Sequence, residues 1–291
     1  MCKVEYLFFE DKIVIKNATD FSLTDTFDCG QCFRFNPVEK NRYIGVAFGN
    51  VAEIISKDGD VIIKNVSKEE FLKNWVEFLD LERDYKEIKR ELSKDEKVNK
   101  AIEYGGGIRI LKQEFFECLI SFIISQQNNI PKIKKAIEGF CVLFGEEISY
   151  NGEKYYTFPA PEKLKDISIS QLAPLKIGYR DKYIIDAVQK VLSGEISYEK
   201  LLNSSYEDAK KQLLGIMGVG EKVANCVLLF SLLKSEAFPV DTWIKKAMES
   251  LYNLEEKNIP QYTRMNFGKY SGFAQQYIFY YIRNNKEKKA N

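Results

Sequence analysis

Hydrophobic and polar residues alternate over residues 4–66 in short runs that are typical of β-strands. Five runs in this region are rich in β-branched and aromatic side chains: KIVIK, CFRF, YIGVAF, VAEII and VIIK. Turn-forming residues separate several of them, at Asn36-Pro37, Gly49-Asn50 and Asp58-Gly59-Asp60. Because short strands joined by tight turns favour antiparallel pairing, the pattern predicts an antiparallel sheet.

The hydrophobic period changes to that of a helix after this region. Residues 68–81 and 84–104 are expected to be helical and to cover one side of the sheet. The first stretch places five apolar side chains on one face: Phe71, Leu72, Trp75, Phe78 and Leu79. Gly105-Gly106-Gly107 ends this helical run and is the best candidate for a domain boundary. Everything after it reads as helices of about 10–15 residues joined by short loops.

Two local signals mark helix ends in this second part. Ser205-Tyr206-Glu207-Asp208 has the form of a capping box, in which a serine and an acidic residue three positions later cap the start of a helix. The basic tail over residues 283–289 is expected to fray and to be solvated.

Length and composition indicate a globular protein. The 291 residues, of which 45% are hydrophobic, can bury one large core or two to three smaller ones. No apolar run approaches the length that spans a bilayer, and the first residues show no signal-peptide pattern. We therefore expect a soluble intracellular protein, in the cytoplasm or at the nucleoid, with no membrane partner.

The net charge of +1 by itself argues nothing for nucleic acid, but its distribution is uneven. Residues 1–104 carry 17 Lys and Arg against 21 Asp and Glu, a net charge of −4, whereas residues 105–291 carry 26 against 21, a net charge of +5. The basic second part is compatible with contacts to phosphates, which is a weak signal.

The cysteines do not form the pattern of a disulfide framework. Six of them occur at irregular spacing: Cys2, Cys29, Cys32, Cys118, Cys141 and Cys226. Cys29-Gly30-Gln31-Cys32 is a C-x-x-C motif, but zinc would need two more ligands, and the chain has neither a second such motif nor any histidine. A thioredoxin-like site would need a βαβ context, so a redox or metal role is the less favoured alternative. The absence of histidine also excludes Ser-His-Asp and Cys-His catalysis.

The strongest candidate chemistry lies in residues 213–243. An apolar helix end is followed by a turn with Gly218 and Gly220 on either side of Val219, and then by a helix that opens with Glu221-Lys222. The glycines leave backbone N–H groups uncovered, and the new helix adds its own free N–H groups and the positive end of its dipole. Together they predict a socket for an anion such as a phosphate.

Lys222 and Asp241 are the candidate reactive groups. Lys222 lies in the first helical turn, where the dipole disfavours the ammonium form, and burial beside Cys226 would disfavour it further. A neutral lysine amine is a nucleophile, and Asp241 offers a charge that can stabilise a cationic transition state or accept a proton. Taken alone, Lys222 would more often be a solvated surface group and Asp241 an N-cap.

The glycine turn, Lys222 and Pro239-Val240-Asp241 resemble the helix-hairpin-helix glycosylases that carry a Gly/Pro-rich loop and a catalytic aspartate, and most closely the 8-oxoguanine DNA glycosylase/lyases. The resemblance implies that Lys222 displaces the base at C1′ to form an imine, that Asp241 stabilises positive charge on the sugar, and that β-elimination follows more slowly. It implies no cofactor and no catalytic metal, although a structural cation at the hairpin turn is compatible with it. Met217 replaces the usual proline, and Trp243 replaces a frequent histidine.

The same resemblance assigns a pocket for the base. Gly30 would offer its main-chain carbonyl to the N7 hydrogen that 8-oxoguanine carries and guanine lacks. Gln275 and Phe279, four residues apart on one helix face, would read the Watson–Crick edge and stack on the base. Cys226 would cover the opposite plane. Without the resemblance, Gly30 is better explained as a turn glycine and the last helix as core packing.

Further residues are assigned to DNA contacts. In the family, the loop that matches Gln127 and Asn128 fills the gap left by the extruded nucleotide, with an asparagine more usual at position 127. Lys132 occupies the place of an arginine that recognises the opposite cytosine in some members. Lysine lacks the planar fork of arginine, so we expect a relaxed opposite-base preference. Tyr179 and Arg180 match a wedge tyrosine and its neighbour. The amides could equally cap helices, and Tyr179 could be a helix-end contact.

We therefore predict an α+β N-terminal domain with a twisted antiparallel sheet over residues 1–104. Mostly helical lobes follow: a helix-hairpin-helix catalytic lobe from residues 105–130 and 206–291, and an inserted lobe over residues 131–205, with the substrate cleft between the two. The predicted function is excision of 8-oxoguanine from duplex DNA, with strand cleavage, by a monomer. The alternatives are a glycosylase of the same superfamily for another oxidised or alkylated base, and a non-catalytic helix-hairpin-helix DNA-binding protein.

Overall fold

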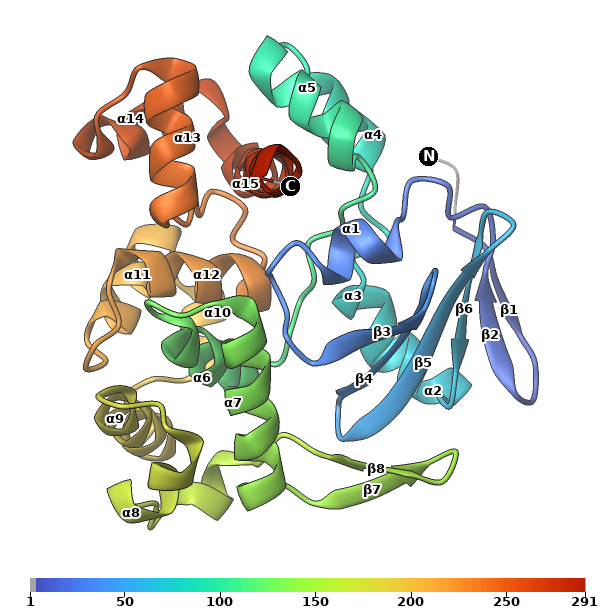
Figure 1. Ribbon diagram of the computed structural model, residues 1–291, viewed down its shortest axis with the longest axis vertical. Coiled ribbons are helices and arrows are strands. Elements are labelled where there is room, and N and C mark those ends of the chain that lie inside the picture. Colours follow the sequence, from blue (N-terminus) through green and yellow to red (C-terminus); the bar gives the residue numbers. More distant parts are fainter. Residues whose placement is uncertain (1–3, 291) are drawn as a thin grey trace.

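The computed structural model describes residues 4–290, without the side chains of residues 286–290, so that Cys2 lies outside the described part. An antiparallel sheet forms the N-terminal part and helices form most of the rest, which confirms the predicted fold class (Figure 1). The sheet has the order β1-β2-β6-β5-β4-β3 and is built from these strands: β1 Tyr6–Phe8, β2 Lys12–Ile15, β3 Phe35–Glu39, β4 Arg42–Ala47, β5 Asn50–Lys57 and β6 Asp60–Lys64.

The strand prediction was wrong at one place. Asn36-Pro37, which was interpreted as a turn, lies inside β3, and only the last residue of the CFRF run belongs to that strand. Pro37 is tolerated there because β3 is an edge strand and proline cannot donate a ladder hydrogen bond. The turn follows at Asn41, which has a φ of 61°. β1 was not among the predicted runs.

Short helical segments cover one side of the sheet: α1 Leu23–Phe27, α2 Lys68–Glu70, a π-helical turn Phe71–Trp75 and α3 Val76–Phe78. Phe71, Trp75 and Phe78 are buried in the sheet's core, but Leu72 is 51% exposed and does not share their face as predicted. The π-turn accounts for this difference, because its wider period puts Phe71 and Trp75, four residues apart, on the inner side and turns Leu72 outward.

The next two helices, α4 Tyr85–Leu92 and α5 Glu96–Gly105, do not cover the sheet, which corrects that part of the prediction. Their buried side chains belong to the helical core, and α5 lies beside the last helix (Figure 1). The rings of Tyr85 and Phe273 pack edge to face, with centroids 5.6 Å apart. Segments on both sides of the glycine run therefore share one core, and the predicted domain limits stay a prediction.

The remaining helices build the rest of the helical part, in which α6 packs against α12. They are α6 Phe115–Ser125, α7 Ile130–Phe144, α8 Ile169–Leu172, α9 Arg180–Leu192, α10 Tyr198–Asn203, α11 Tyr206–Leu214, α12 Glu221–Leu232, α13 Thr242–Tyr252, α14 Ile259–Asn266 and α15 Ser271–Ala290, with 3-10 turns at Pro161–Leu164, Ala173–Leu175, Glu256–Asn258 and Gly268–Tyr270. Phe122 of α6 stacks on Phe230 of α12, with ring centroids 5.4 Å apart. No helix in the described part of the chain is both long and apolar enough to cross a membrane.

A β-hairpin within the helical part was not expected. β7 Glu147–Tyr150 pairs with β8 Glu153–Tyr156 across a turn at Asn151-Gly152, where both residues have positive φ, 52° and 82°. Asn-Gly between two polar-aromatic runs is a strong hairpin signal, so this element was within reach of the sequence. The Tyr150 hydroxyl donates to Glu53 of β5 at 2.6 Å, so the hairpin reaches the sheet.

Two helix-end predictions are also corrected. Ser205 caps α11 by accepting from the Asp208 N–H at 3.1 Å, but its hydroxyl donates back to the Asp208 carboxylate at 2.6 Å, and the reciprocal backbone bond of a capping box is not formed. α15 does not fray at its predicted position, because Arg283 is half-buried and donates to the main-chain carbonyl of Asp28.

Candidate active site

The turn between α11 and α12 has the conformation that its glycines suggest. Gly218 has a φ of 74°, and a Cβ built on it would lie 2.2 Å from the Tyr183 ring of α9. Only glycine fits there, for both conformational and steric reasons. Gly220 is the N-cap of α12 and provides no capping side chain, and Met217 is 50% exposed. The start of α12 thus presents uncovered N–H groups at the surface.

Lys222 is half-buried in the first turn of α12. Its Nζ donates to Ser125 Oγ at 3.2 Å and lies 4.9 Å from the centroid of the Phe122 ring. Ser125, the last residue of α6, donates its own hydroxyl to the Phe122 carbonyl at 2.8 Å, so its oxygen is an acceptor toward the lysine. Cys226 lies one turn further along α12, where burial raises the pKa of its thiol to about 11 despite the nearby Lys222. The thiol is therefore neutral near pH 7.

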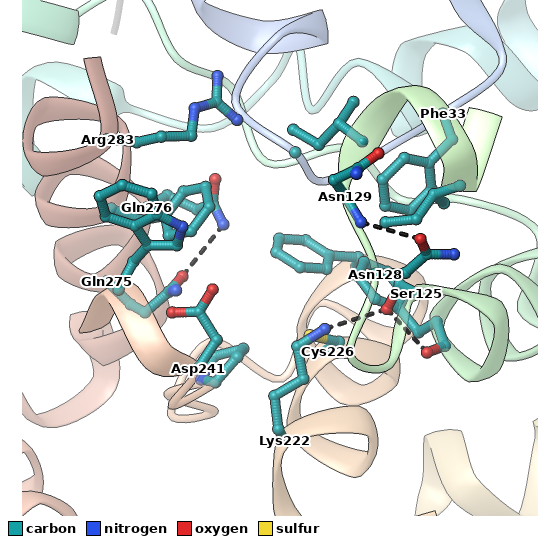
Figure 2. A pocket seen from close by; sticks show the side chains of 18 of the residues that line it. Phe33, Ser125, Asn128, Asn129, Lys222, Cys226, Asp241, Gln275, Gln276 and Arg283 are labelled. Atoms are coloured by element: carbon teal, nitrogen blue, oxygen red, sulfur yellow. Dashed lines mark hydrogen bonds between the residues drawn. The ribbon is translucent and has the colours of Figure 1, made fainter. Parts of the chain in front are cut away.

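Asp241 begins α13 as its N-cap. Its Oδ1 accepts from the Ile244 N–H at 2.8 Å, as predicted for a carboxylate just before a helix. Burial raises the pKa of Asp241 above the ordinary value, while the Ile244 hydrogen bond and the charge of Lys222 act in the opposite direction. The carboxylate faces the same space as Lys222, on the side of Gln275 (Figure 2).

A cavity of about 430 Å³ brings the predicted base-binding residues together. Gly30, Cys226, Gln275 and Phe279 all line it, with Lys222 and Asp241. Gly30 has a φ of 80°, and a Cβ added to it would lie 3.3 Å from the Phe279 ring. The loop that carries Gly30 therefore packs so closely on α15 that even a methyl group would force Phe279 to shift slightly. Gly272 allows α15 to pack on α12, since a Cβ there would lie 2.4 Å from Leu229.

The cavity has further walls whose residues were not predicted from the sequence to belong to the site. They include Phe33, Phe122, Ser125, Asn129, Phe230, Trp243, Gln276 and Arg283. For Gln276 and Arg283 a signal existed, because they lie three residues before and four residues after Phe279, on one stripe of α15. Phe33 and Ser125 lie close in sequence to Gly30 and Gln127, but nothing in their residue types marked them as part of the site.

Most of the predicted DNA contacts lie outside the cavity. Asn128 lines it, whereas Gln127, at a φ of 46°, and Lys132 are exposed beside it. Asn129, and not its neighbours, caps α7 by accepting from the Lys132 N–H at 3.0 Å. Arg180 at the start of α9 holds this loop, because its Nε donates to the Gln126 carbonyl at 3.0 Å.

Tyr179 is 46% exposed just before α9. The Tyr179 ring packs edge to face on the Tyr183 ring, with centroids 5.5 Å apart. The guanidinium carbon of Arg180 lies 4.7 Å from the centroid of the Tyr179 ring. Tyr183 is also the side chain against which Gly218 fits, so the tyrosine pair and the hairpin turn form one continuous surface.

The C-x-x-C motif lacks the properties of a reactive pair. Cys29 and Cys32 are both buried free thiols, and Cys29 Sγ donates to the Thr26 carbonyl at 3.1 Å. Burial raises the pKa of Cys29 to about 12 and raises that of Cys32 as well. A thiol that is buried and protonated does not support redox chemistry. In the part of the chain that the structure describes, no group of three or more His, Cys, Asp or Glu side chains could hold a metal ion.

Comparisons with protein families cover nearly the whole chain. Residues 13–119 match the family model of the 8-oxoguanine DNA glycosylase N-terminal domain. Residues 120–270 match the model of the HhH-GPD superfamily base excision DNA repair proteins. The boundary between the two matches falls inside α6.

Individual relatives include a solved structure of the Clostridium acetobutylicum 8-oxoguanine glycosylase/lyase in complex with double-stranded DNA containing cytosine opposite 8-oxoguanine. It has a TM-score of 0.93 and 44% identity, over 98% of each chain. A probable N-glycosylase/DNA lyase of Methanothermobacter thermautotrophicus is 30% identical over 65% of this chain and 68% of that protein. A DNA-3-methyladenine glycosylase of Bacillus subtilis is 31% identical over 62% of this chain and 60% of that protein.

Proposed function

Because the chain belongs to the 8-oxoguanine DNA glycosylase/lyases of the HhH-GPD superfamily, we propose that it excises 8-oxoguanine from duplex DNA and then cleaves the strand. One observation carries the proposal: the amine of Lys222 and the carboxylate of Asp241 face the same cavity that Gly30, Cys226, Gln275 and Phe279 line. Nucleophile, charge stabiliser and base pocket thus meet at one place.

The cavity suits a planar base that has been turned out of the helix, since a stacked base is out of reach. The Phe279 ring would cover one plane of the base and the neutral Cys226 thiol the other. The Gly30 carbonyl would accept from the N7 hydrogen of 8-oxoguanine, and it would repel the N7 lone pair of guanine. The close packing of Gly30 against Phe279 limits the movement of this loop, which makes the discrimination effective.

The chemical step needs the free amine of Lys222. Its nitrogen forms a bond to C1′, and the bond from C1′ to N9 breaks with its electron pair going to the base. Asp241 stabilises the positive charge that develops on the sugar. The departing base takes up the proton that the attached amine loses. The lone pair of the amine then expels the ring oxygen, which takes a proton from water, and the resulting protonated imine acidifies the C2′ hydrogen. Loss of that proton and cleavage of the C3′–O bond complete β-elimination.

The duplex would lie across the surface formed by the hairpin turn, Gln127 and Tyr179. The N–H groups at Gly218 and Gly220 would bind a phosphate, as the start of a helix commonly does. Arg180 would support the loop that carries Gln127. Lys132 contributes a point charge, and we propose that the preference for cytosine opposite the lesion is correspondingly weak.

A single chain provides the whole proposed site, so we propose a monomer that acts on chromosomal DNA at the nucleoid. The alternative of an alkylated base is less favoured, because aspartate-only chemistry would leave Lys222 and its contact with Ser125 without a role. A purely DNA-binding protein would leave the cavity unexplained.

Borohydride trapping on a duplex with one 8-oxoguanine tests the proposal, because the reagent reduces the imine to a stable adduct. We expect an adduct with the unaltered protein on the damaged duplex only. Lys222→Gln should abolish it, whereas Lys73→Gln, which removes an exposed lysine near the sheet, should not. A duplex that is bound without any adduct, or an adduct with Lys222→Gln, would overturn the lysine assignment, and excision without trapping would favour an aspartate-only enzyme.

A further inference from the structure

Gln276 lines the cavity but has no part in the proposed chemistry. It is 3% exposed and lies beside Gln275, which is 4% exposed. Its Nε2 donates to Gln275 Oε1 at 3.1 Å (Figure 2). The other end of the amide, Oε1, is buried and has no hydrogen-bond partner among the residues that the structure describes. A buried amide with one end unsatisfied costs free energy and calls for an explanation.

Arg283 supplies a reason for the orientation of this amide. Gln276 and Arg283 are seven residues apart on the cavity side of α15, and Figure 2 shows the Gln276 oxygen on the side of its amide that faces Arg283. The guanidinium donates to the Asp28 carbonyl, and its Nη1 is buried and without a partner in the described structure. A positive charge on that side favours the oxygen over the NH₂ group, which leaves the NH₂ group for Gln275.

The orientation of Gln276 determines that of Gln275. An amide can turn by 180° and exchange its donor and acceptor ends. As long as Gln276 donates, Gln275 must keep Oε1 toward it. Gln275 then presents its NH₂ donor and the second lone pair of its Oε1 at fixed positions along the edge of a ligand, and the two cannot exchange places. If Gln276 accepted instead, Gln275 would turn, and the order of donor and acceptor would be reversed.

We propose that Gln276 is a positioning residue that sets the specificity for the Watson–Crick edge of the bound base, an inference that rests on the proposed function. 8-Oxoguanine has an acceptor, O6, beside a donor, N1–H. 8-Oxoadenine has the reverse, a donor at N6 beside an acceptor at N1. Both carry the N7 hydrogen that Gly30 would read, so Gly30 cannot separate them. Discrimination between the two oxidised purines falls to the Gln275–Gln276 pair.

Two substitutions at Gln276 give opposite constraints. Gln276→Met has a similar volume but no donor, so Gln275 is free to turn. Gln276→Glu can only accept when ionised, so it holds Gln275 by its NH₂ group and favours the reversed order. We expect the ratio of single-turnover excision rates, 8-oxoguanine over 8-oxoadenine, to fall about tenfold in Gln276→Met, the effect of about one hydrogen bond. It should fall further in Gln276→Glu.

A double-mutant cycle separates positioning from packing. In a Gln275→Ala background, Gln276→Met should leave the ratio unchanged, because the residue through which it acts is gone. Gln261→Met, an exposed glutamine of α14, is the matched control and should change nothing. Unfolding temperatures report any general loss of stability.

The outcomes are distinct. If the unaltered protein does not excise 8-oxoguanine, the proposed function fails. If it does, but Gln276→Met lowers both rates equally or has the same effect in the Gln275→Ala background, Gln276 is only a packing residue and the inference is overturned. A ratio that falls in the order unaltered protein, Gln276→Met, Gln276→Glu supports it.

Discussion

Replacement of Ser125 by alanine tests how the nucleophile is held. The Ser125 hydroxyl donates to the Phe122 carbonyl at 2.8 Å, which leaves its lone pairs for the Lys222 amine at 3.2 Å. Lys222 has a long, flexible side chain, and the Phe122 ring at 4.9 Å restrains it less directionally than a hydrogen bond does. Without the hydroxyl, the amine would spend less time in the geometry that attacks C1′.

The expected magnitude follows from one hydrogen bond in a partly buried site. Such a bond contributes about 1 kcal/mol net, and up to about 3 kcal/mol when one partner is charged. Since about 1.4 kcal/mol corresponds to a factor of ten in rate, Ser125→Ala should slow imine formation by a factor between about 5 and about 140. The affinity for the damaged duplex should change little, because the Ser125 hydroxyl contacts Lys222 and is not among the groups proposed to hold the base.

The measurement is a single-turnover time course of borohydride-trapped adduct, together with the Kd for the same duplex. Ser121→Ala is the matched control, since Ser121 is a buried serine on the same helix that does not line the cavity. Trapping at the unaltered rate in Ser125→Ala would refute the reasoning. A slower rate that is explained entirely by a raised Kd would refute it as well.

Two further predictions concern Asp241 and Gly218. Burial raises the pKa of Asp241, so the folded protein holds that proton more tightly than the unfolded chain, and the ionised carboxylate destabilises the fold above the raised pKa. Asp241→Asn keeps an acceptor for the Ile244 N–H and should raise Tm at neutral pH while abolishing excision. The gain in Tm should vanish below about pH 4, where the Asp241 carboxyl is neutral in both the folded and the unfolded state. An unchanged Tm at neutral pH would contradict this prediction. Gly218→Ala should reduce duplex affinity and Tm, because its φ of 74° is combined with a clash against Tyr183. Gly49→Ala, with the same φ of 74° but open space around it, isolates the conformational cost of about 1–2 kcal/mol, and equal Tm losses in the two variants would argue against the clash.

Much of the site could be predicted because its chemistry depends on short stretches of chain. Lys222 lies at a helix start because Gly218 and Gly220 precede it, and Asp241 caps the next helix because it directly precedes Thr242. These placements depend on residues within about one helical turn, which local propensities describe. The β-hairpin at Asn151-Gly152 was also within reach of the sequence, and its signal was overlooked.

Other features depend on contacts that no local pattern contains. α4 and α5 have apolar faces that fit either the sheet or the helical core, and only the packed structure places them beside α15. The partner of Lys222 is 97 residues away in the sequence, and that of Arg283 is 255 residues away. The choice among such partners depends on which surfaces the whole chain can bury together.

The sequence by itself determined the antiparallel sheet, the glycine turn and the helix starts that carry Lys222 and Asp241, because hydrophobic period, turn chemistry and capping act over a few residues. The choice of these two residues as nucleophile and carboxylate came from the resemblance to the glycosylase family. Only the tertiary structure decided that the Lys222 amine donates to Ser125, that Gln276 donates to Gln275 and that the cysteine motif is buried. Hydrogen-bond direction and burial are properties of a three-dimensional neighbourhood, and that neighbourhood is assembled from segments far apart in the chain.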